Sequence, residues 1–343
     1  MLSKLSQIIS QPCIAVDLGT ANTRIYSSQQ GEFTEKPSSI SLTDGKTNNF
    51  SDEYLEYTNN RLATKPLRCG VVVDLKNATM LLKPLIKKSR RFLMAPITLA
   101  CAPTDTTENE RDLLRKALVN AGASHVSIIP EVFAAAIGAG INIAHTNAQL
   151  LIDIGDGVTD MAVFRDGHII YSSSVRIACS DLQKSIRSAI LSKYKMQIYD
   201  HEAERLPHEV LSILKSEDHG SESVGVAGID VIKRRKTNIL VNKKDIISSI
   251  EPVLNKITKM IEDSLKRLPE KIYCEILESG ICLTGGGACI EGMDIIIALK
   301  TNMEVRIASD PIHAVINGAI KTLNYWNGKK NWWENIFWPK LPA

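Results

Sequence analysis

Two short turns combine an aspartate with glycines between apolar strands. The first is DLGTANT at residues 17–23, and the second is DIGDGVTD at residues 153–160. Glycine lets the backbone approach a ligand closely, and backbone N–H groups in such turns can bind phosphate. Asp156 places a carboxylate between the glycines of the second turn, where a phosphate loop would favour no negative charge. The alternative for each aspartate is that it only forms the turn.

The elements that must position these turns follow a plan that the sequence repeats, with a β-hairpin in each half. The first half has hairpin strands over 13–28, a candidate third strand at 37–42 and a polar, loop-rich insertion at 43–66. The second half has a hairpin over 149–175 and a long amphipathic helix over 245–268. Loops at strand ends are where α/β proteins bind ligands, so we expect the two turns to face each other across a cleft.

Helix boundaries are visible between the two hairpins. Thr107 and Glu110 have the spacing of a capping box before an apolar-periodic run, and Gly122 is placed to end that helix. Pro84 is expected to kink or delay the preceding helix. The small-residue segment EVFAAAIGAGI, at 131–141, predicts a helix that packs closely against its neighbours.

Bulk composition excludes several classes of protein. The formal net charge of +3 is too small to indicate a nucleic-acid partner. Two basic runs, at 87–91 and 233–236, are interpreted as solvated faces. The seven scattered cysteines indicate reduced thiols in a cytosolic protein, rather than zinc ligands or a disulfide framework. No apolar run reaches the ~18 residues of a membrane-spanning helix, and no cleavable signal peptide is expected.

Four segments together resemble the actin-like ATPase superfamily and, within it, the bacterial actin MreB family. They are DLGTANT (17–23), AAAIGAG (134–140), DIGDGVTD (153–160) and LTGGGACIEGMD (283–294), in the order and spacing of that superfamily. The similarity extends over residues 1–325. It implies an α/β, actin-like fold, duplicated in the manner of ribonuclease H, with two lobes, four subdomains and a nucleotide cleft.

The resemblance also implies the limits of the subdomains. The expected ranges are 1–31 and 67–145 for subdomain IA, 32–66 for IB, 146–183 and 251–325 for IIA, and 184–250 for IIB, with 326–343 as a Trp-rich tail.

A site for ATP or ADP with Mg²⁺ follows from the same resemblance. Asp17, Asp153 and Asp156 are expected to hold Mg²⁺ through its waters. The residues expected at the phosphates are Gly19, Thr20, Ala21, Asn22, Arg24, Gly155, Asp156, Gly157, Val158 and Thr159. Those expected at the adenosine are Glu204, Gly285, Gly286 and Gly287. For the three glycines, the alternative is a turn that caps a helix.

The sequence departs from the usual MreB pattern at several places. The second turn has Asp156 and Val158 where MreB usually reads DIGGGTT, but GDGVT is the form in eukaryotic actin, which implies a carboxylate facing the water shell of the metal. Arg24 matches by position the phosphate-contacting Lys of eukaryotic actin; the alternative is an exposed strand residue. Pro207, in AERLPHEV, replaces the Lys of the AERIKHEI segment, which predicts weaker nucleotide binding or looser base selectivity.

Hydrolysis requires a group that orients water in line with the γ-phosphate. MreB-like proteins use a Glu just before the small-residue helix, and Glu131 has that position here. Pro130 precedes Glu131, whereas the family typically has Glu followed by Pro. The alternative for Glu131 is an acid at a helix N-terminus, favoured by the helix dipole. The expected reaction is slow hydrolysis of ATP to ADP and phosphate, coupled to polymerisation.

Both ends of the chain carry amphipathic signals. Residues 1–10 place their apolar side chains within one arc of a helix, which predicts an interfacial membrane helix; the alternative is a terminus packed on its own domain. All four tryptophans lie within 326–338. They suit the headgroup boundary of a membrane, a protein partner, or packing on the chain's own core.

The leading interpretation is a bacterial actin that polymerises with Mg–ATP at the inner face of the cell membrane and organises cell-wall synthesis and cell shape. Its expected partners are further copies of the chain, the membrane surface and a membrane protein, with no nucleic acid. The alternatives are a non-polymerising membrane adaptor or scaffold of actin fold, and a filament that positions an organelle or other cargo. A metabolic kinase or a chaperone ATPase is disfavoured, because neither a sugar-kinase catalytic motif nor a substrate domain is present.

Overall fold

The computed structural model describes residues 11–43, 46–48, 63–90, 94–215 and 222–326. The amphipathic segment 1–10 and the Trp-rich tail after residue 326 lie outside these described residues. The chain forms two compact units, one of residues 1–142 with 313–343 and the other of residues 143–312.

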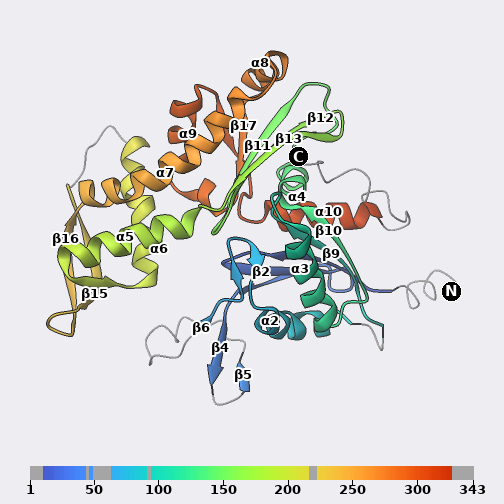
Figure 1. The fold of residues 1–343 in the computed structure, drawn as a ribbon, viewed down its shortest axis with the longest axis horizontal. Helices are drawn as coiled ribbons and strands as arrows, with labels where there is room; N and C mark the ends of the chain where they lie inside the picture. The colour runs from blue at the N-terminus through green and yellow to red at the C-terminus, as the bar shows by residue number, and fades with distance from the viewer. Residues whose placement is uncertain (1–10, 44–45, 49–62, 91–93, 216–221, 327–343) are drawn as a thin grey trace. The chain divides into compact units, whose positions relative to one another are not determined.

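The first unit is built on a five-stranded sheet with the order β10-β9-β1-β2-β3 (Figure 1). Strands β1, β2 and β3 are antiparallel neighbours, whereas β9 runs parallel to both β1 and β10. The strands span Cys13–Leu18 (β1), Asn22–Ser27 (β2), Phe33–Pro37 (β3), Ile97–Ala102 (β9) and His125–Pro130 (β10). The predicted first hairpin is therefore confirmed.

Two pairs of helices pack on this sheet. Helices α2 (Leu75–Lys88) and α3 (Glu108–Ala121) contact each other, and alternate β1 residues such as Ile14 and Val16 join their apolar core. Helices α4 (Glu131–Gly138) and α10 (Ala314–Trp326) form the second pair, and α10 also contacts β1 and β9. Helix α10 thus packs in the first unit, although the predicted ranges group it with the second half; the subdomain limits otherwise stay a prediction.

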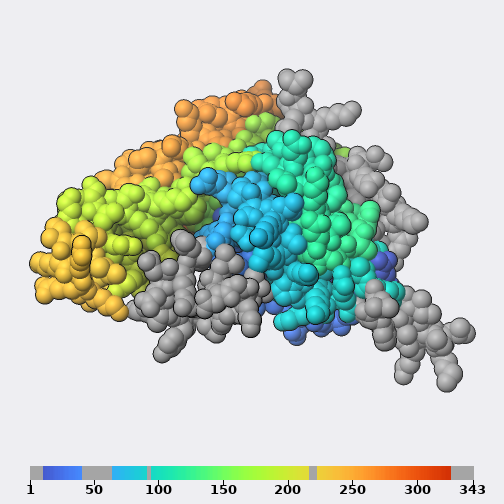
Figure 2. All heavy atoms as spheres, turned by 60° about the horizontal axis from the view of Figure 1, so that its bottom comes forward, coloured from blue at the N-terminus to red at the C-terminus, as the bar shows by residue number. Residues whose placement is uncertain are grey.

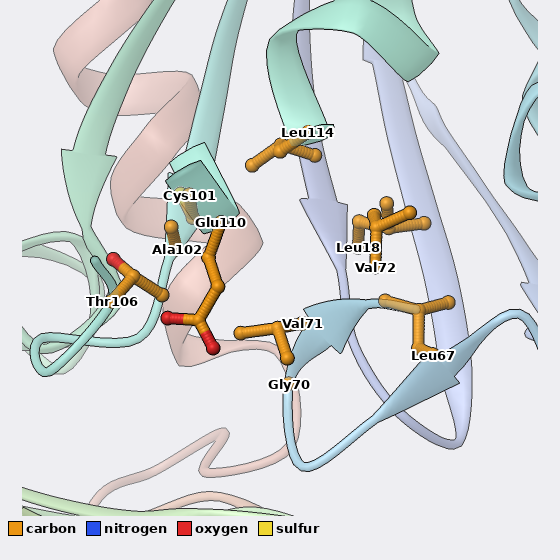
Figure 3. Close-up of a pocket in the computed structure, with 10 residues that line it drawn as sticks. All are labelled: Leu18, Leu67, Gly70, Val71, Val72, Cys101, Ala102, Thr106, Glu110 and Leu114. Carbon is orange, nitrogen blue, oxygen red and sulfur yellow. The ribbon is translucent and has the colours of Figure 1, made fainter. Parts of the chain in front are cut away.

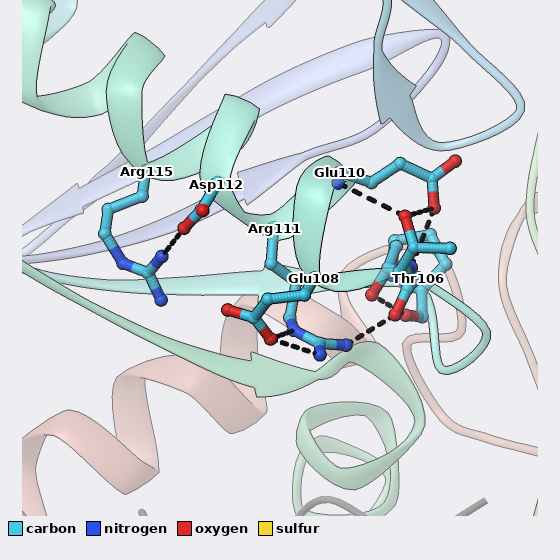
Figure 4. A network of polar contacts seen from close by, with 8 residues as sticks. Thr106, Glu108, Glu110, Arg111, Asp112 and Arg115 are labelled. Atoms are coloured by element: carbon cyan, nitrogen blue, oxygen red, sulfur yellow. Dashed lines mark hydrogen bonds and ion pairs between the residues drawn. The ribbon is translucent and has the colours of Figure 1, made fainter.

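Helix α3 begins with the predicted capping box. The Thr107 hydroxyl accepts the N–H of Glu110 at 3.3 Å, and the Glu110 carboxylate accepts the N–H of Thr107 at 2.8 Å. Figure 4 shows this network with the ion pair from Arg111 to Glu108 one turn along. Gly122 ends the helix with φ of 112°, in the left-handed region that favours glycine. Pro84, which was expected to kink or delay its helix, lies inside α2.

Short strands form outside the main sheet. The strand predicted at 37–42 is present as β4, over Ile40–Thr43, whereas the edge strand of the main sheet, β3, was not predicted. Strand β4 belongs to a separate three-stranded sheet, and a two-stranded ribbon follows. These strands are β4 (Ile40–Thr43), β5 (Lys46–Asn48), β6 (Ala63–Thr64), β7 (Leu67–Arg68) and β8 (Val71–Val72).

The second unit repeats the topology of the first. Its main sheet has the order β13-β12-β11-β17-β18, again three antiparallel strands followed by two parallel ones. The strands span Gln149–Ile154 (β11), Thr159–Arg165 (β12), His168–Val175 (β13), Ile281–Thr284 (β17) and Val305–Ile307 (β18). The predicted internal duplication is confirmed.

Helices and a smaller sheet complete the second unit around one apolar core. The helices are α5 (Cys179–Tyr194), α6 (Asp200–Leu211), η1 (Ser212–Lys215), α7 (Lys243–Lys266), α8 (Glu270–Ser279), η2 (Gly286–Cys289) and α9 (Met293–Thr301). The smaller sheet contains β14 (Met196–Ile198), β15 (Ser223–Asp230) and β16 (Arg235–Asn242). Within the described ranges, no helix has both the length and the apolar character needed to cross a membrane.

Candidate nucleotide-binding elements

The β1–β2 turn is held in place from the loop after β3. The N–H of Gly19 donates to the carbonyl of Asn22 at 3.0 Å, and a Cβ at Gly19 would lie 2.9 Å from that oxygen. The Ser38 hydroxyl donates to the Gly19 carbonyl at 2.6 Å, and the Ser38 N–H donates to the Ala21 carbonyl at 2.7 Å. Thr20 accepts the N–H of Gly70 at 2.8 Å. The turn is therefore tight and fixed at both ends.

Asp17, Arg24 and Glu35 form one row across β1, β2 and β3. They are direct neighbours in the strand register. The Arg24 guanidinium donates to Asp17 at 3.1 Å and to Glu35 at 2.7 Å. Arg24 is 8% exposed, so the alternative that it is an exposed strand residue is wrong. Burial raises the pKa of Asp17, and the charge of Arg24 opposes that shift.

The row continues to the start of α10. The second carboxylate oxygen of Glu35 lies 3.4 Å from Nε2 of His313, and the His313 ring packs against Phe33 with centroids 5.2 Å apart. The Nε of Arg24 is buried without a hydrogen-bond partner. A buried cation with one unused donor is suited to an anionic ligand.

Glu131 and Asp17 lie at the same edge of the first sheet. Cys101 is opposite Asp17 in the register of β1 and β9, and Ile129, two residues before Glu131, is opposite Cys101 in β10. The pKa of the Cys101 thiol is well above its usual value, mainly through burial and further through the charges of Asp17 and Glu131. Glu131 is the first residue of α4, following Pro130 at the N-cap. The carboxyl ends of these strands thus bring the two predicted acids together.

A pocket lies behind the first turn (Figure 3). It is formed mostly by apolar side chains, and Glu110 from α3 supplies its carboxylate. The lining residues are Leu18, Leu67, Gly70, Val71, Val72, Cys101, Ala102, Thr106, Glu110 and Leu114. Gly70 connects the pocket to the turn through its hydrogen bond to Thr20.

The β11–β12 turn has a similar internal bond. The N–H of Gly155 donates to the carbonyl of Val158 at 2.9 Å. The turn is also bonded to the start of α5, because the N–H of Ser180 donates to the Asp156 carbonyl at 2.9 Å. Asp156 and Gly155 are partly exposed, whereas Gly157, Val158 and Thr159 are buried. The Thr159 hydroxyl donates to the Ile177 carbonyl at 2.8 Å, so it is engaged within the protein.

Asp153 is buried at the end of β11. Its carboxylate accepts the Thr284 hydroxyl at 2.6 Å, which links it to the end of β17. Asp160 is directly opposite Asp153 in the hairpin and is only 1% exposed. The sequence interpretation did not assign Asp160 to the site, although counting equal distances from the turn would have paired it with Asp153.

The glycine segment after β17 packs on the same hairpin. A Cβ at Gly285 would lie 2.3 Å from the carbonyl oxygen of Ile154, and one at Gly287 would lie 2.3 Å from the Ile154 side chain. Gly285 also has φ of 82°, which favours glycine. A Cβ at Gly286 would meet no atom within 4 Å. Close packing therefore explains why positions 285 and 287 require glycine, whereas the surface at Gly286 is open to a ligand.

Helix α6 carries the remaining predicted adenosine residue. Glu204 is exposed on this helix, whereas Pro207 is buried in its interior. The end of α6 lies against the loop that follows the glycine segment, because a Cβ at Gly292 would lie 2.5 Å from the carbonyl oxygen of Leu211. The second unit thus brings Asp153, Asp156 and the three glycines together, with α6 adjacent to the same segment.

The carboxylates fit a metal held through water rather than directly. Across the described ranges, no three His, Cys, Asp or Glu side chains are grouped to ligate a metal ion. Asp17 and Asp153 each accept a hydrogen bond from a neighbouring side chain, which fixes the carboxylate and leaves lone pairs for water. Carboxylate oxygens are ligands suited to Mg²⁺, which keeps several of its waters.

A duplicated sheet of this topology, with a glycine turn at the corresponding hairpin of each half, defines an actin-fold protein. The family model for the MreB/Mbl protein matches residues 11–331. The chain belongs to the MreB/Mbl family.

Similar proteins agree with this assignment. The cell shape-determining protein MreB of Escherichia coli (strain K12) is 30% identical, covering 94% of this chain and 96% of that protein. Mbl of Bacillus subtilis (strain 168) is also 30% identical, over 89% of this chain and 93% of that protein. The crystal structure of MreB5 of Spiroplasma citri bound to ADP has a TM-score of 0.82 at 30% identity, covering 93% and 99% of the two chains. The MamK double helical filament, at 19% identity with a TM-score of 0.76, shares the fold.

Proposed function

We propose that this chain is an ATP-binding bacterial actin that forms filaments with Mg–ATP and organises cell shape from the inner membrane surface. The observation that carries the proposal is the pair of equivalent glycine turns, each with a buried aspartate at the end of its preceding strand. Relatives support it, because MreB5 of Spiroplasma citri was solved with ADP and with AMPPNP, and the curated relatives are cell shape-determining proteins.

The proposed roles are assigned to individual residues as follows. Backbone N–H groups of both turns bind the phosphates, together with the Arg24 guanidinium. The glycine segment supports the adenine at the open face of Gly286, and Glu204 contacts the ribose. Asp17, Asp153 and Asp156 hold the water shell of Mg²⁺, which neutralises charge on the phosphates. Glu131 orients the water that attacks the γ-phosphate, giving slow hydrolysis to ADP and phosphate.

Filament formation and membrane attachment complete the proposal. Further copies of the chain are the proposed partners in the filament, and residues 1–10 with the Trp-rich tail are the proposed membrane contacts. The protein would then be cytoplasmic and peripheral at the inner face of the membrane, where a membrane protein is a further partner. A filament that positions an organelle or other cargo remains the second candidate, favoured by the departures at Asp156 and Pro207.

Sedimentation with Mg–ATP, followed by electron microscopy of the pellet, tests the proposal. We expect filaments with ATP and a larger soluble fraction with ADP. Soluble monomers under every nucleotide condition would contradict the filament and leave a non-polymerising scaffold. A Glu131→Ala variant should bind ATP as the parent does and release phosphate more slowly; unchanged release would remove Glu131 from the hydrolytic role.

Pro207 gives a separate test of the adenosine side. Since the side chain is buried and lacks an amine, we expect weak discrimination between ATP and GTP. Equilibrium titrations of both nucleotides measure this directly. Micromolar, ATP-selective binding would show that this position does not determine selectivity.

A further inference from the structure

The β15–β16 hairpin has two different faces. Its inner face contributes Val224, Val226 and Val241 to the core of the second unit. On its outer face, Leu240 is 73% exposed and lies opposite Gly225, where an added Cβ would meet no atom within 4 Å. Ile229, on the same outer face, is 36% exposed. Within the described part of the chain, the outer face therefore exposes apolar side chains beside the polar Asn238 and the cationic Lys236.

The turn of this hairpin extends the apolar surface. Ile232, at the tip, is 74% exposed, and Val231 beside it is 41% exposed. The Asp230 carboxylate accepts the N–H groups of Ile232 and Lys233 at 2.9 and 2.8 Å. These bonds fix the turn and hold the Ile232 backbone in its exposed position.

Cations surround these apolar side chains. Lys233, Arg234 and Arg235 are exposed, and no ion pair engages any of the three among the residues that the structure describes. Asp230 is the one acid among residues 230–236, against four basic residues. In Figure 2 this segment lies at the yellow end of the second unit, with its side chains on the surface. The run at 233–236, interpreted from sequence as a solvated face, is thus joined to exposed apolar residues.

We propose that the tip and outer face of the β15–β16 hairpin bind an anionic lipid surface. Ile232 and Leu240 would enter the boundary between headgroups and acyl chains, while Lys233, Arg234 and Arg235 remain at the anionic headgroups. Nucleic acid fits less well, because residues 222–242 contain no aromatic side chain on which bases could stack. A second copy of the same tip would be repelled by its like charge. This contact is separate from residues 1–10 and requires neither ATP hydrolysis nor filaments.

Vesicle binding of the full chain tests this proposal. Vesicles of phosphatidylglycerol with phosphatidylcholine should bind the parent more tightly than vesicles of phosphatidylcholine alone, and added salt should weaken this binding. The variant Lys233→Gln with Arg234→Asn should lose about 30-fold in affinity for the anionic vesicles, since each of the two cations near such a surface contributes about 1 kcal/mol. Asn tolerates the left-handed backbone at position 234, where φ is 50°.

Two further variants make the test specific. Lys87→Gln with Lys88→Gln removes the same charge from the other basic run, at the end of α2, and should bind nearly as the parent does. Ile232→Ser with Leu240→Ser keeps the charge and should also lose at least several-fold in affinity for the anionic vesicles. A purely electrostatic contact would show no such loss. Thermal unfolding of each variant checks that the fold is kept.

Either of two results would overturn the proposal. One result is that both hairpin variants bind anionic vesicles as tightly as the parent or the α2 control. The other is a loss of ATP-dependent sedimentation without vesicles in the hairpin variants alone, which would make this face an interface between copies of the chain.

Discussion

Arg24→Met tests whether charge holds the row of Asp17, Arg24 and Glu35 across the first sheet. The side chains of Arg24 and Asp17 are 10% and 6% exposed, so the substitution leaves a buried carboxylate without its cation. Losing one partner of a buried ion pair costs about 3–5 kcal/mol. We expect about 3 kcal/mol, the lower end of that range, because Glu35 is 33% exposed and can be hydrated when Arg24 is removed.

The assay is urea unfolding of the nucleotide-free protein at pH 8 and pH 5. Burial raises the folded-state pKa of Asp17, so the folded chain binds more protons than the unfolded chain as pH rises above the ordinary value. Arg24 opposes this shift, so the pKa of Asp17 is higher still in Arg24→Met, and the loss of stability should be larger at pH 8 than at pH 5. Adding Asp17→Asn should recover about half of the loss, because a neutral amide needs no cation.

A surface pair provides the matched control. Arg115 pairs with Asp112 on α3, where the two side chains are 41% and 45% exposed. Arg115→Met should cost under about 1 kcal/mol. Equal losses from Arg24→Met and Arg115→Met, or no recovery in the double variant, would refute the reasoning.

Three further predictions concern other parts of the fold. Gly318→Ala should lower the free energy of unfolding in urea by about 2 kcal/mol or more, because its Cβ would lie 1.7 Å from a carbonyl oxygen of α4. The control Gly225→Ala should be nearly neutral, because its Cβ would meet no atom within 4 Å. Equal effects of the two substitutions would contradict the close packing at Gly318. Cys179 is partly exposed, but desolvation raises the pKa of its thiol to about 12, so it should react with iodoacetamide far more slowly at pH 8 than the exposed cysteines; rapid labelling would contradict the raised pKa. The hydrogen bond from Lys193 is the main cause that lowers the pKa of Asp245. An NMR titration of Asp245 should therefore give a midpoint below the ordinary aspartate value, and this midpoint should rise in Lys193→Met. An unchanged midpoint in the variant would show that Lys193 does not cause the shift.

Local signals in the sequence were sufficient for the hairpins, the capping box at Thr107 and the helix end at Gly122. Each depends on residues within a few positions of one another, so the local pattern determines the structure. The strand predicted at 37–42 corresponds to β4, whereas β3 was missed because its sequence, FTEKP, has little apolar character. Pairing with β2, rather than its own composition, makes β3 a strand.

Residues that join distant segments were not predictable in the same way. Ser38 bonds the first turn from the loop after β3, and His313 reaches Glu35 across 278 positions of sequence. The pairing of Arg24 with Glu35 depends on the register of β3 against β2, which no sequence motif specifies. Asp160, by contrast, follows from the hairpin register of Asp153, so the sequence contained enough to find it.

Calorimetric titration of Mg–ATP into the parent and a Gly286→Leu variant tests whether the glycine segment forms part of a nucleotide site. An added Cβ at Gly286 would meet no atom within 4 Å, so the variant should fold normally and its side chain should fill the proposed adenine face. We expect one nucleotide bound per chain in the parent and a loss of affinity of at least ~10-fold in the variant, equivalent to about 1.4 kcal/mol. No heat of binding in the parent, or equal affinity in the two proteins, would contradict this expectation.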